Sequence, residues 1–407
     1  MKDAASITGI GVVSSAAIGR ENFVRALREG HPGVKPVTLF RPQGRCHLAG
    51  EATEFDPTRS LTPREARRMD RGTQMGVVAA LEAVEDAALE GEDLGRLRVG
   101  ICLATCAGGA HRALEFWESD RTGRLRPTLA LQSIPNAAAS WLGRKLGLRG
   151  PSLTFSTACS ASATALGFAL DLLREGLADV VLAGGYEPLC ELAFAGFECM
   201  RAFAVDAVRP FDLNRSGLLL GEGSAVLVLE RPDIARSRGA TIRGRLLGYG
   251  ASCDAFHTTK PDPTGEGAAR AMRGALSDSG LVAAEVDHIN AHGTGTRQND
   301  PMESRAIHAV LGPRAAEVPV TSVKSCLGHT LGAAGAIEVV ASLLAANEGF
   351  IPPTLNHETL DPECSLDVVA SAARPARVRH FLSNSFGFGG SNVSLAVGTA
   401  YGLPARA

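Results

Sequence analysis

The chain has 407 residues, of which 45% are hydrophobic and 21% are charged. These proportions exclude a disordered tail, a coiled coil and a collagen-like repeat, and the length suits two or three domains or one large α/β body. With 41 Lys and Arg against 43 Asp and Glu, the net charge of −2 gives no general attraction to nucleic acid or to an anionic membrane.

Strand-like and helix-like segments alternate along the chain, which predicts an α/β fold with mostly parallel sheets. In the first part, buried apolar runs predict strands, and amphipathic runs predict helices. The strands are expected at 7–13, 99–104, 153–156, 180–183 and 225–229, and the helices at 75–90 and 160–175. In the second part, strands are expected at 242–250, 288–291 and 318–323, and helices at 267–279 and 332–347.

The order helix, strand, Gly-rich loop, strand, polar turn, helix occurs twice. This predicts two pseudo-duplicated halves, residues 1–235 and 236–407, packed into one body, with residues 230–233 as the seam. A likeness of pattern alone also arises by chance, so the repeat is a hypothesis.

Nine cysteines stand at irregular positions, and neither their odd number nor their spacing is typical of a disulfide framework or a zinc site. The apolar stretch near the N-terminus is too short for a signal peptide, and no run of about 18 uncharged apolar residues predicts a membrane span. We therefore expect a protein of a reducing compartment, the cytoplasm, and no bound metal.

The segment Ser156-Thr157-Ala158-Cys159-Ser160 lies where a predicted strand ends and a predicted helix begins. Free N–H groups and the helix dipole at such a junction favour a thiolate, so Cys159 is a candidate nucleophile. A cysteine that simply opens a buried helix is the alternative, and on this segment alone the two are equally good.

Two further segments carry histidines. His292 ends a predicted strand and is followed by a Gly/Thr loop in which Thr294 and Thr296 offer hydroxyls, although a hydrogen-bonded loop histidine is the simpler interpretation. Lys324 and His329 lie five residues apart across a predicted turn, and Glu338 on the next helix is placed to orient one of them; a solvated Lys324 is the alternative.

A Gly-rich segment, Asn384 to Asn392, could bring backbone N–H groups close to a ligand and supply an oxyanion donor. A phosphate loop is less suitable because no Lys-Ser/Thr follows the glycines. The Gly9-Ile10-Gly11 start is a poor dinucleotide fingerprint, since Ser14 stands where the third glycine belongs.

Taken together and in this order, these motifs resemble the β-ketoacyl-acyl-carrier-protein synthases of the KAS II type, which are fatty-acid condensing enzymes. The resemblance runs from residue 7 to about residue 397. It implies the thiolase-like fold, an α/β architecture of two pseudo-duplicated halves in five layers, and usually a homodimer.

The resemblance also implies roles for single residues. Cys159 would accept the acyl group as a thioester, His292 and His329 would assist malonyl decarboxylation, and Lys324 and Glu338 would support the histidines. The N–H groups of Cys159 and Phe388 would form the oxyanion hole. Residues expected to contact the substrate are Thr259, Thr294, Thr296, Phe386, Phe388, Cys106, Ala107 and Phe197, and those expected to dock an acidic acyl carrier protein are Arg64, Arg67, Arg68 and Arg201.

The implied reaction is the decarboxylative condensation of malonyl-carrier with the acyl group on Cys159, in fatty-acid elongation. No cofactor is implied beyond the phosphopantetheine of the carrier protein. A ketosynthase of a specialised type II polyketide or polyene pathway, paired with a chain-length-factor-like subunit, is the alternative. A non-catalytic partner subunit is disfavoured because Cys159 and both histidines are present, and a thiolase because the C-terminal Gly-rich segment has no cysteine.

Overall fold

The computed structural model of the chain describes residues 4–89 and 91–402. An eleven-stranded mixed sheet runs through the molecule, in the order β12-β10-β9-β14-β15-β8-β1-β7-β6-β4-β5. Its strands from the first part of the chain are β1 (Ala5–Ser14), β4 (Val99–Ala104), β5 (Ser152–Phe155), β6 (Val180–Glu187) and β7 (Gly223–Glu230). Those from the second part are β8 (Gly244–Cys253), β9 (His288–Asn290), β10 (Pro319–Thr321), β12 (Asp367–Val368), β14 (His380–Gly387) and β15 (Ser391–Thr399).

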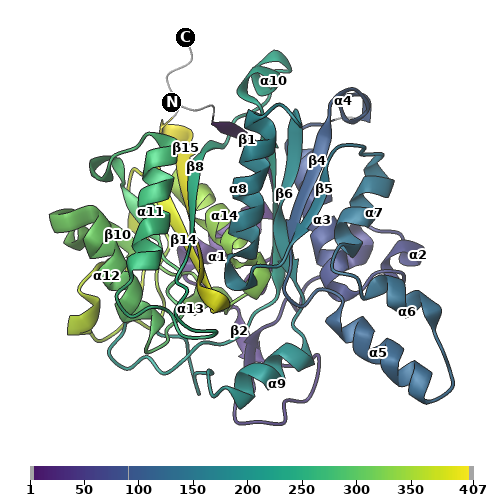
Figure 1. Cartoon of the computed structure of the whole chain (residues 1–407), viewed down its shortest axis with the longest axis horizontal. Helices are drawn as coiled ribbons and strands as arrows, with labels where there is room; N and C mark the ends of the chain where they lie inside the picture. Colours follow the sequence, from purple (N-terminus) through teal and green to yellow (C-terminus); the bar gives the residue numbers. More distant parts are fainter. Residues whose placement is uncertain (1–3, 90, 403–407) are drawn as a thin grey trace.

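The two halves of this sheet lie on either side of a central layer of helices, and further helices cover their outer faces (Figure 1). Helices and sheet halves thus alternate in five layers. The central helices α8 (Ala161–Arg174) and α14 (Ala334–Asn347) lie between the two halves. On the outside, α3 (Arg71–Asp86) and α7 (Ala137–Leu146) cover the first half, while α11 (Glu266–Ser279) and α12 (Asn299–Leu311) cover the second.

Shorter elements complete the fold. The remaining helices are α1 (Arg20–Glu29), α2 (Pro63–Ala66), α4 (Gly91–Arg96), α5 (Ala110–Arg121), α6 (Pro127–Gln132), α9 (Glu191–Cys199), α10 (Pro232–Ser237) and α13 (Lys324–Leu327). Two small sheets pair β2 (Val34–Pro36) with β3 (Leu48–Gly50), and β11 (Phe350–Ile351) with β13 (Arg374–Pro375).

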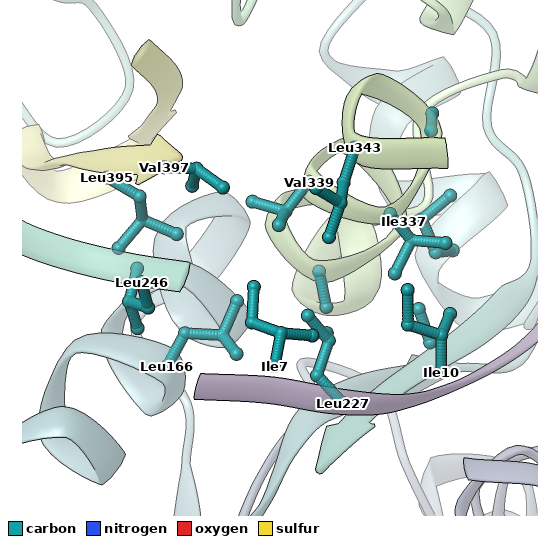
Figure 2. Packing of buried hydrophobic residues seen from close by; sticks show 14 of the residues in the cluster. Ile7, Ile10, Leu166, Leu227, Leu246, Ile337, Val339, Leu343, Leu395 and Val397 are labelled. Atoms are coloured by element: carbon teal, nitrogen blue, oxygen red, sulfur yellow. The ribbon is translucent and has the colours of Figure 1, made fainter. Parts of the chain in front are cut away.

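The central hydrophobic core joins the two halves (Figure 2). Side chains of β1 and β7, such as Ile7 and Leu227, face Val339 and Leu343 of α14 across it. Because α14 is buried between layers, its sequence is apolar or small on almost every side, as expected for a core helix.

The Gly9-Ile10-Gly11 segment serves helix–strand packing. A Cβ on Gly9 would lie 2.0 Å from the Ala83 carbonyl oxygen of α3, and one on Gly11 would lie 1.9 Å from that of Ala79. Both glycines therefore allow α3 to approach β1 closely, and they serve this packing rather than a nucleotide-binding turn.

The twelve segments expected from sequence all appear as strands or helices of the predicted type, with ends that shift by a few residues. The helix expected at 75–90 begins earlier, at Arg71, because the Asp70 side chain caps it by accepting from the Thr73 N–H at 2.8 Å, and it ends at Asp86; residue 90 lies outside the described residues.

The expectation of mostly parallel pairing is wrong. Strand β1 is antiparallel to both β7 and β8, and the pairs β6–β7, β8–β15 and β14–β15 are antiparallel too. Parallel pairing is confined to the outer parts of the sheet, where helices connect the strands. Over the described ranges, no helix is both long and apolar enough to cross a bilayer.

Candidate active site

A cavity of about 430 Å³ collects residues from both halves of the molecule. It contains the candidate nucleophile and both candidate histidines. The expected site residues that line it are Cys159, Phe197, Arg201, Thr259, His292, Thr294, Thr296, His329, Phe386 and Phe388.

Cys159 lies on a tight turn between β5 and α8. Ala158, directly before it, has a φ of 52°, in the left-handed region that non-glycine residues seldom adopt. Such strain persists only where the surrounding structure fixes it, and is typical of functional sites. The Ser160 hydroxyl fastens the turn by donating to the Thr157 carbonyl at 2.8 Å.

The Cys159 thiol is buried, and this burial raises its pKa to about 11. The charge of Lys324 and the backbone of Phe388 lower the pKa and so act in the opposite direction. Burial thus opposes the thiolate expected at the helix start, whereas Lys324 and the Phe388 backbone favour it.

The His292 loop is held by a buried carboxylate. Glu303 of α12 accepts from the N–H groups of His292 and Gly293, both at 2.8 Å. Its position is fixed in turn by Asn384, whose amide donates to it at 3.2 Å. His292 is thus presented from the end of β9 by backbone anchoring rather than by a hydrogen bond to its ring.

His329 has a defined tautomer. The Leu331 N–H donates to its Nδ1 at 3.3 Å, so the ring proton lies on Nε2. Within the described ranges, His329 Nε2 and His292 Nδ1 are buried polar atoms with no hydrogen-bond partner. Burial, with the charge of Lys324 adding to it, holds the pKa of each histidine well below its usual range, and both rings are neutral.

Lys324 is a buried residue, which excludes the solvated alternative. It forms an ion pair with Glu338 of α14, and its side chain is 2% exposed. Burial raises the pKa of Glu338 to about 7 against the opposing influence of Lys324. The expected turn between Lys324 and His329 contains a short helix, α13.

The segment 384–392 is a hairpin rather than an open loop. Residues up to Gly387 belong to β14, Phe388 to Gly390 form a tight turn, and β15 follows. A Cβ on Gly387 would lie 3.0 Å from the Thr157 carbonyl oxygen and 3.2 Å from the Cys159 nitrogen. This close approach places the hairpin directly against the nucleophile turn.

The remaining cavity wall combines hydroxyls with aromatic rings. The Thr294 and Thr296 hydroxyls are hydrogen-bonded to each other at 3.0 Å, and Thr259 lies on the same cavity. Phe388 stacks on Phe197 with ring centroids 5.9 Å apart, and Phe386 lies 5.8 Å from the His292 ring. Such a channel suits a slender chain that is polar in one part and apolar in another.

Some expected site residues are not brought to this cavity. Cys106 and Ala107 do not line it, and their roles in an acyl pocket stay predictions. Arg64, Arg67 and Arg68 are exposed on α2 and the turn that follows. The neighbouring Arg71 is different, because it forms an ion pair with the fully buried Glu222 at 2.6 Å.

Sequence reasoning missed several lining residues, among them Asp254, Lys260 and Ser216. Asp254 fastens the hairpin, since its carboxylate accepts from the Asn392 amide at 2.6 Å and its N–H donates to the Gly390 carbonyl. No local pattern marks these residues. The described part of the chain contains no group of three or more His, Cys, Asp or Glu side chains that is arranged to hold a metal ion.

Comparison with known proteins identifies the family. The model of the β-ketoacyl synthase N-terminal domain matches residues 2–235, and that of the C-terminal domain matches residues 243–358. A 3-oxoacyl-[acyl-carrier-protein] synthase 2 of Synechocystis sp. is 40% identical over 405 residues, covering 96% of each chain. A putative polyketide β-ketoacyl synthase 1 of Streptomyces cyaneus is also 40% identical over 405 residues, covering 95% of each chain.

Among solved structures, the ishigamide ketosynthase/chain length factor superposes with a TM-score of 0.94 at 40% identity, covering 98% of this chain and 100% of that one. The chain therefore belongs to the β-ketoacyl synthase family and has its thiolase-like fold.

Proposed function

We propose that this protein is a 3-oxoacyl-[acyl-carrier-protein] synthase that elongates fatty acyl chains, with Cys159 as its nucleophile. One observation carries the proposal: the Cys159 thiol shares a single cavity with His292 and His329, and Phe388 lines the same cavity. We also propose that residues 1–235 and 236–407 are the two pseudo-duplicated halves, so that the first supplies the thiol and the second supplies the imidazoles.

In the first half-reaction, Sγ of Cys159 attacks the carbonyl carbon of an acyl thioester on the carrier. The bond between that carbon and the carrier sulfur breaks, and the thiol proton ends on the departing carrier thiol. After the attack and before the carrier thiol leaves, the carbonyl oxygen is an oxyanion, and the N–H groups of Cys159 and Phe388 stabilise it. Because the thioester that breaks and the thioester that forms are of similar energy, the transfer needs positioning more than driving force.

In the second half-reaction, a malonyl thioester occupies the cavity and loses CO₂. The electron pair of the broken C–C bond forms an enolate, whose oxygen accepts from His292 and from Nε2–H of His329. The enolate carbon attacks the thioester on Cys159, and the sulfur leaves and takes up a proton. Neutral imidazoles suit this step, since each can donate without surrendering its proton to the enolate.

The carrier and the oligomer follow from the same proposal. The phosphopantetheine arm would pass Thr259, Thr294 and Thr296, while Arg64, Arg67, Arg68 and Arg201 would dock the acidic carrier protein. No other cofactor is required, and we propose that the protein acts in the cytoplasm as a homodimer.

The Ser160 hydroxyl bonds to Ser391 at 3.0 Å, which ties the nucleophile turn to the hairpin and supports their joint role.

A second function is favoured by a specific observation. The ishigamide ketosynthase/chain length factor and the Streptomyces cyaneus polyketide synthase are as similar in sequence as the fatty-acid relative. A ketosynthase of a type II polyketide or polyene pathway, paired with a chain-length-factor-like subunit, is therefore the alternative assignment.

The deciding experiment measures CO₂ release from malonyl-carrier together with the mass of acylated Cys159. We expect CO₂ release and a 3-ketoacyl product only with malonyl-carrier present, and no 3-ketoacyl product in Cys159→Ala. Malonyl-independent cleavage of 3-ketoacyl-CoA would instead indicate a thiolase, and absence of acylation would indicate a non-catalytic subunit. Comparing saturated with polyene acyl-carriers separates the two pathway assignments.

A further inference from the structure

Glu187, the last residue of β6, is a fully buried carboxylate that the reaction described above does not use. It has no ion-pair partner among the residues that the structure describes, and hydrogen-bond donors surround it instead. One carboxylate oxygen accepts from the Cys106 N–H at 2.9 Å and the Gly332 N–H at 2.7 Å. The other accepts from the Ala107 N–H at 2.6 Å and the Thr105 hydroxyl at 3.2 Å.

These donors come from two segments far apart in sequence. Thr105, Cys106 and Ala107 follow β4 of the first half, whereas Gly332 belongs to the second half and stands three residues after His329. A Cβ on Gly332 would lie 2.7 Å from the Glu187 carboxylate and 2.8 Å from the Cys106 nitrogen, so the two segments touch at this point. The carboxylate therefore joins both halves of the molecule beside the nucleophile.

The turn that Glu187 anchors also sets the His329 ring. Leu331, between His329 and Gly332, has a φ of 44°, a strained value that its neighbours must maintain. Its N–H donates to His329 Nδ1 and thereby fixes the proton on Nε2. Anchoring Gly332 keeps Leu331 in this conformation.

We propose that Glu187 is a positioning residue of the condensation: it fixes the Thr105–Ala107 segment and the Gly332 turn against each other, and so sets His329 relative to Cys159. The inference rests on the proposed function. Burial raises the pKa of Glu187 to about 7, and above that pH its negative charge also reaches the nucleophile, because Glu187 is among the groups that raise the pKa of Cys159, after burial itself. A residue that only filled space would not have this electrostatic effect.

The test compares Glu187→Gln with Glu187→Asp. Glutamine offers one oxygen where the site needs two, so a pair of donors loses its acceptor, while aspartate keeps the charge and both oxygens. We expect Glu187→Gln to lower kcat of condensation by roughly 10- to 100-fold, the effect of a displacement near 1 Å, and Glu187→Asp to recover part of it. Alkylation of Cys159 by iodoacetamide should move to lower pH in Glu187→Gln but not in Glu187→Asp.

Glu51→Gln is the matched control. Glu51 is likewise buried and accepts from two backbone N–H groups and a hydroxyl, of Thr38 and Leu39, but it does not line the cavity. We expect its kcat and alkylation profile to equal those of the wild type. If Glu187→Gln matches Glu51→Gln in both measurements, the inference is overturned.

Two further outcomes are decisive. Should Glu187→Gln fail to fold, Thr105→Val removes one donor to the carboxylate at nearly constant volume; a few-fold loss of kcat supports the inference, and an unchanged kcat overturns it. Should the wild type alkylate at Cys159 yet form no 3-ketoacyl product, the proposed function fails. The alkylation profile would still decide whether Glu187 acts on Cys159, because that readout does not need turnover.

Discussion

The rings of His292 and His329 meet edge to face, with centroids 5.4 Å apart and planes inclined by 80°. His292 follows the end of β9 and His329 follows the short helix α13, yet both reach the cavity that contains Cys159. In this arrangement two neutral N–H donors can converge on one developing oxyanion.

Replacing His292 by alanine separates the two half-reactions. His292→Ala should lower condensation by about 100-fold or more, because one oxyanion donor is lost, while acylation of Cys159 continues. Mass spectrometry of the acyl-enzyme and product formation from malonyl-carrier measure the two steps. Undiminished condensation in this variant would contradict the role assigned to His292.

Adding one methyl group at Gly387 tests the contact between the hairpin and the nucleophile turn. The new Cβ would press on Thr157 and Cys159, so Gly387→Ala should slow acylation roughly tenfold or more by moving the Phe388 N–H. Gly196→Ala is the control: Gly196 is an exposed position of α9 with open space around it, and alanine there should leave the rate unchanged and stabilise the helix by up to about 1 kcal/mol. Equal rates in the two variants would argue against the contact.

The docking arginines predict a salt-dependent defect. Reversing Arg67 and Arg68 together to glutamate should lower kcat/KM for carrier-bound substrate about tenfold at low salt, and less at high salt, because rim charges mainly affect association. Turnover of a free pantetheine thioester should not change. Arg236→Glu is the control. Arg236 lies on α10, at the end of the molecule opposite α9, and α9 leads into the docking residue Arg201 (Figure 1). A defect that also affects the free thioester would place the arginines elsewhere than at the docking surface.

His288 of β9 predicts how stability depends on pH. Burial lowers its pKa from 6.5 to about 4, and its Nδ1 bonds to the Pro319 carbonyl at 3.0 Å. Between pH 4 and pH 6.5 the unfolded chain binds a proton at His288 that the folded chain does not bind. The contribution of His288 to the free energy of unfolding is therefore complete above pH 6.5 and falls as the pH drops toward 4. From pH 7 to pH 5 the loss should be about 2 kcal/mol.

His288→Asn keeps a donor for Pro319 and removes the titration. Urea unfolding at the two pH values should therefore show a stability difference from wild type that shrinks by about 2 kcal/mol at pH 5. The comparison between variants is needed because Asp300 and Glu303, whose pKa values burial raises to about 6, act with the opposite sign. A difference that stays constant with pH would show that His288 does not titrate in this range.

The parts that local pattern determines were predictable. Buried strands such as β4 and helices such as α8 follow from apolar periodicity, and Cys159, His292 and His329 follow from motifs in a recognisable order. The strand directions at the centre of the sheet were not predictable, because β1 pairs with strands about 210 to 240 residues away. Nor was the pKa of Cys159, which depends on burial by both halves.

Residues that act through partners distant in sequence were the hardest to find. Glu187 stands in an apolar run that ends a strand, and nothing beside it indicates that its acceptors serve Cys106 and Gly332. Asp254 is similar, since its role depends on the hairpin at Asn392. Their significance arises only when the two halves are packed together.

The position of β1 between β7 and β8 has a consequence for biosynthesis. Strand β1 pairs with Gly223–Glu230 on one side and Gly244–Leu246 on the other, so during synthesis its two edges stay open until those later strands have been made. An open strand edge invites pairing with other chains. Neither half is therefore suited to expression as a separate fragment, and a nascent chain stalled before residue 246 would need a chaperone to shield this edge.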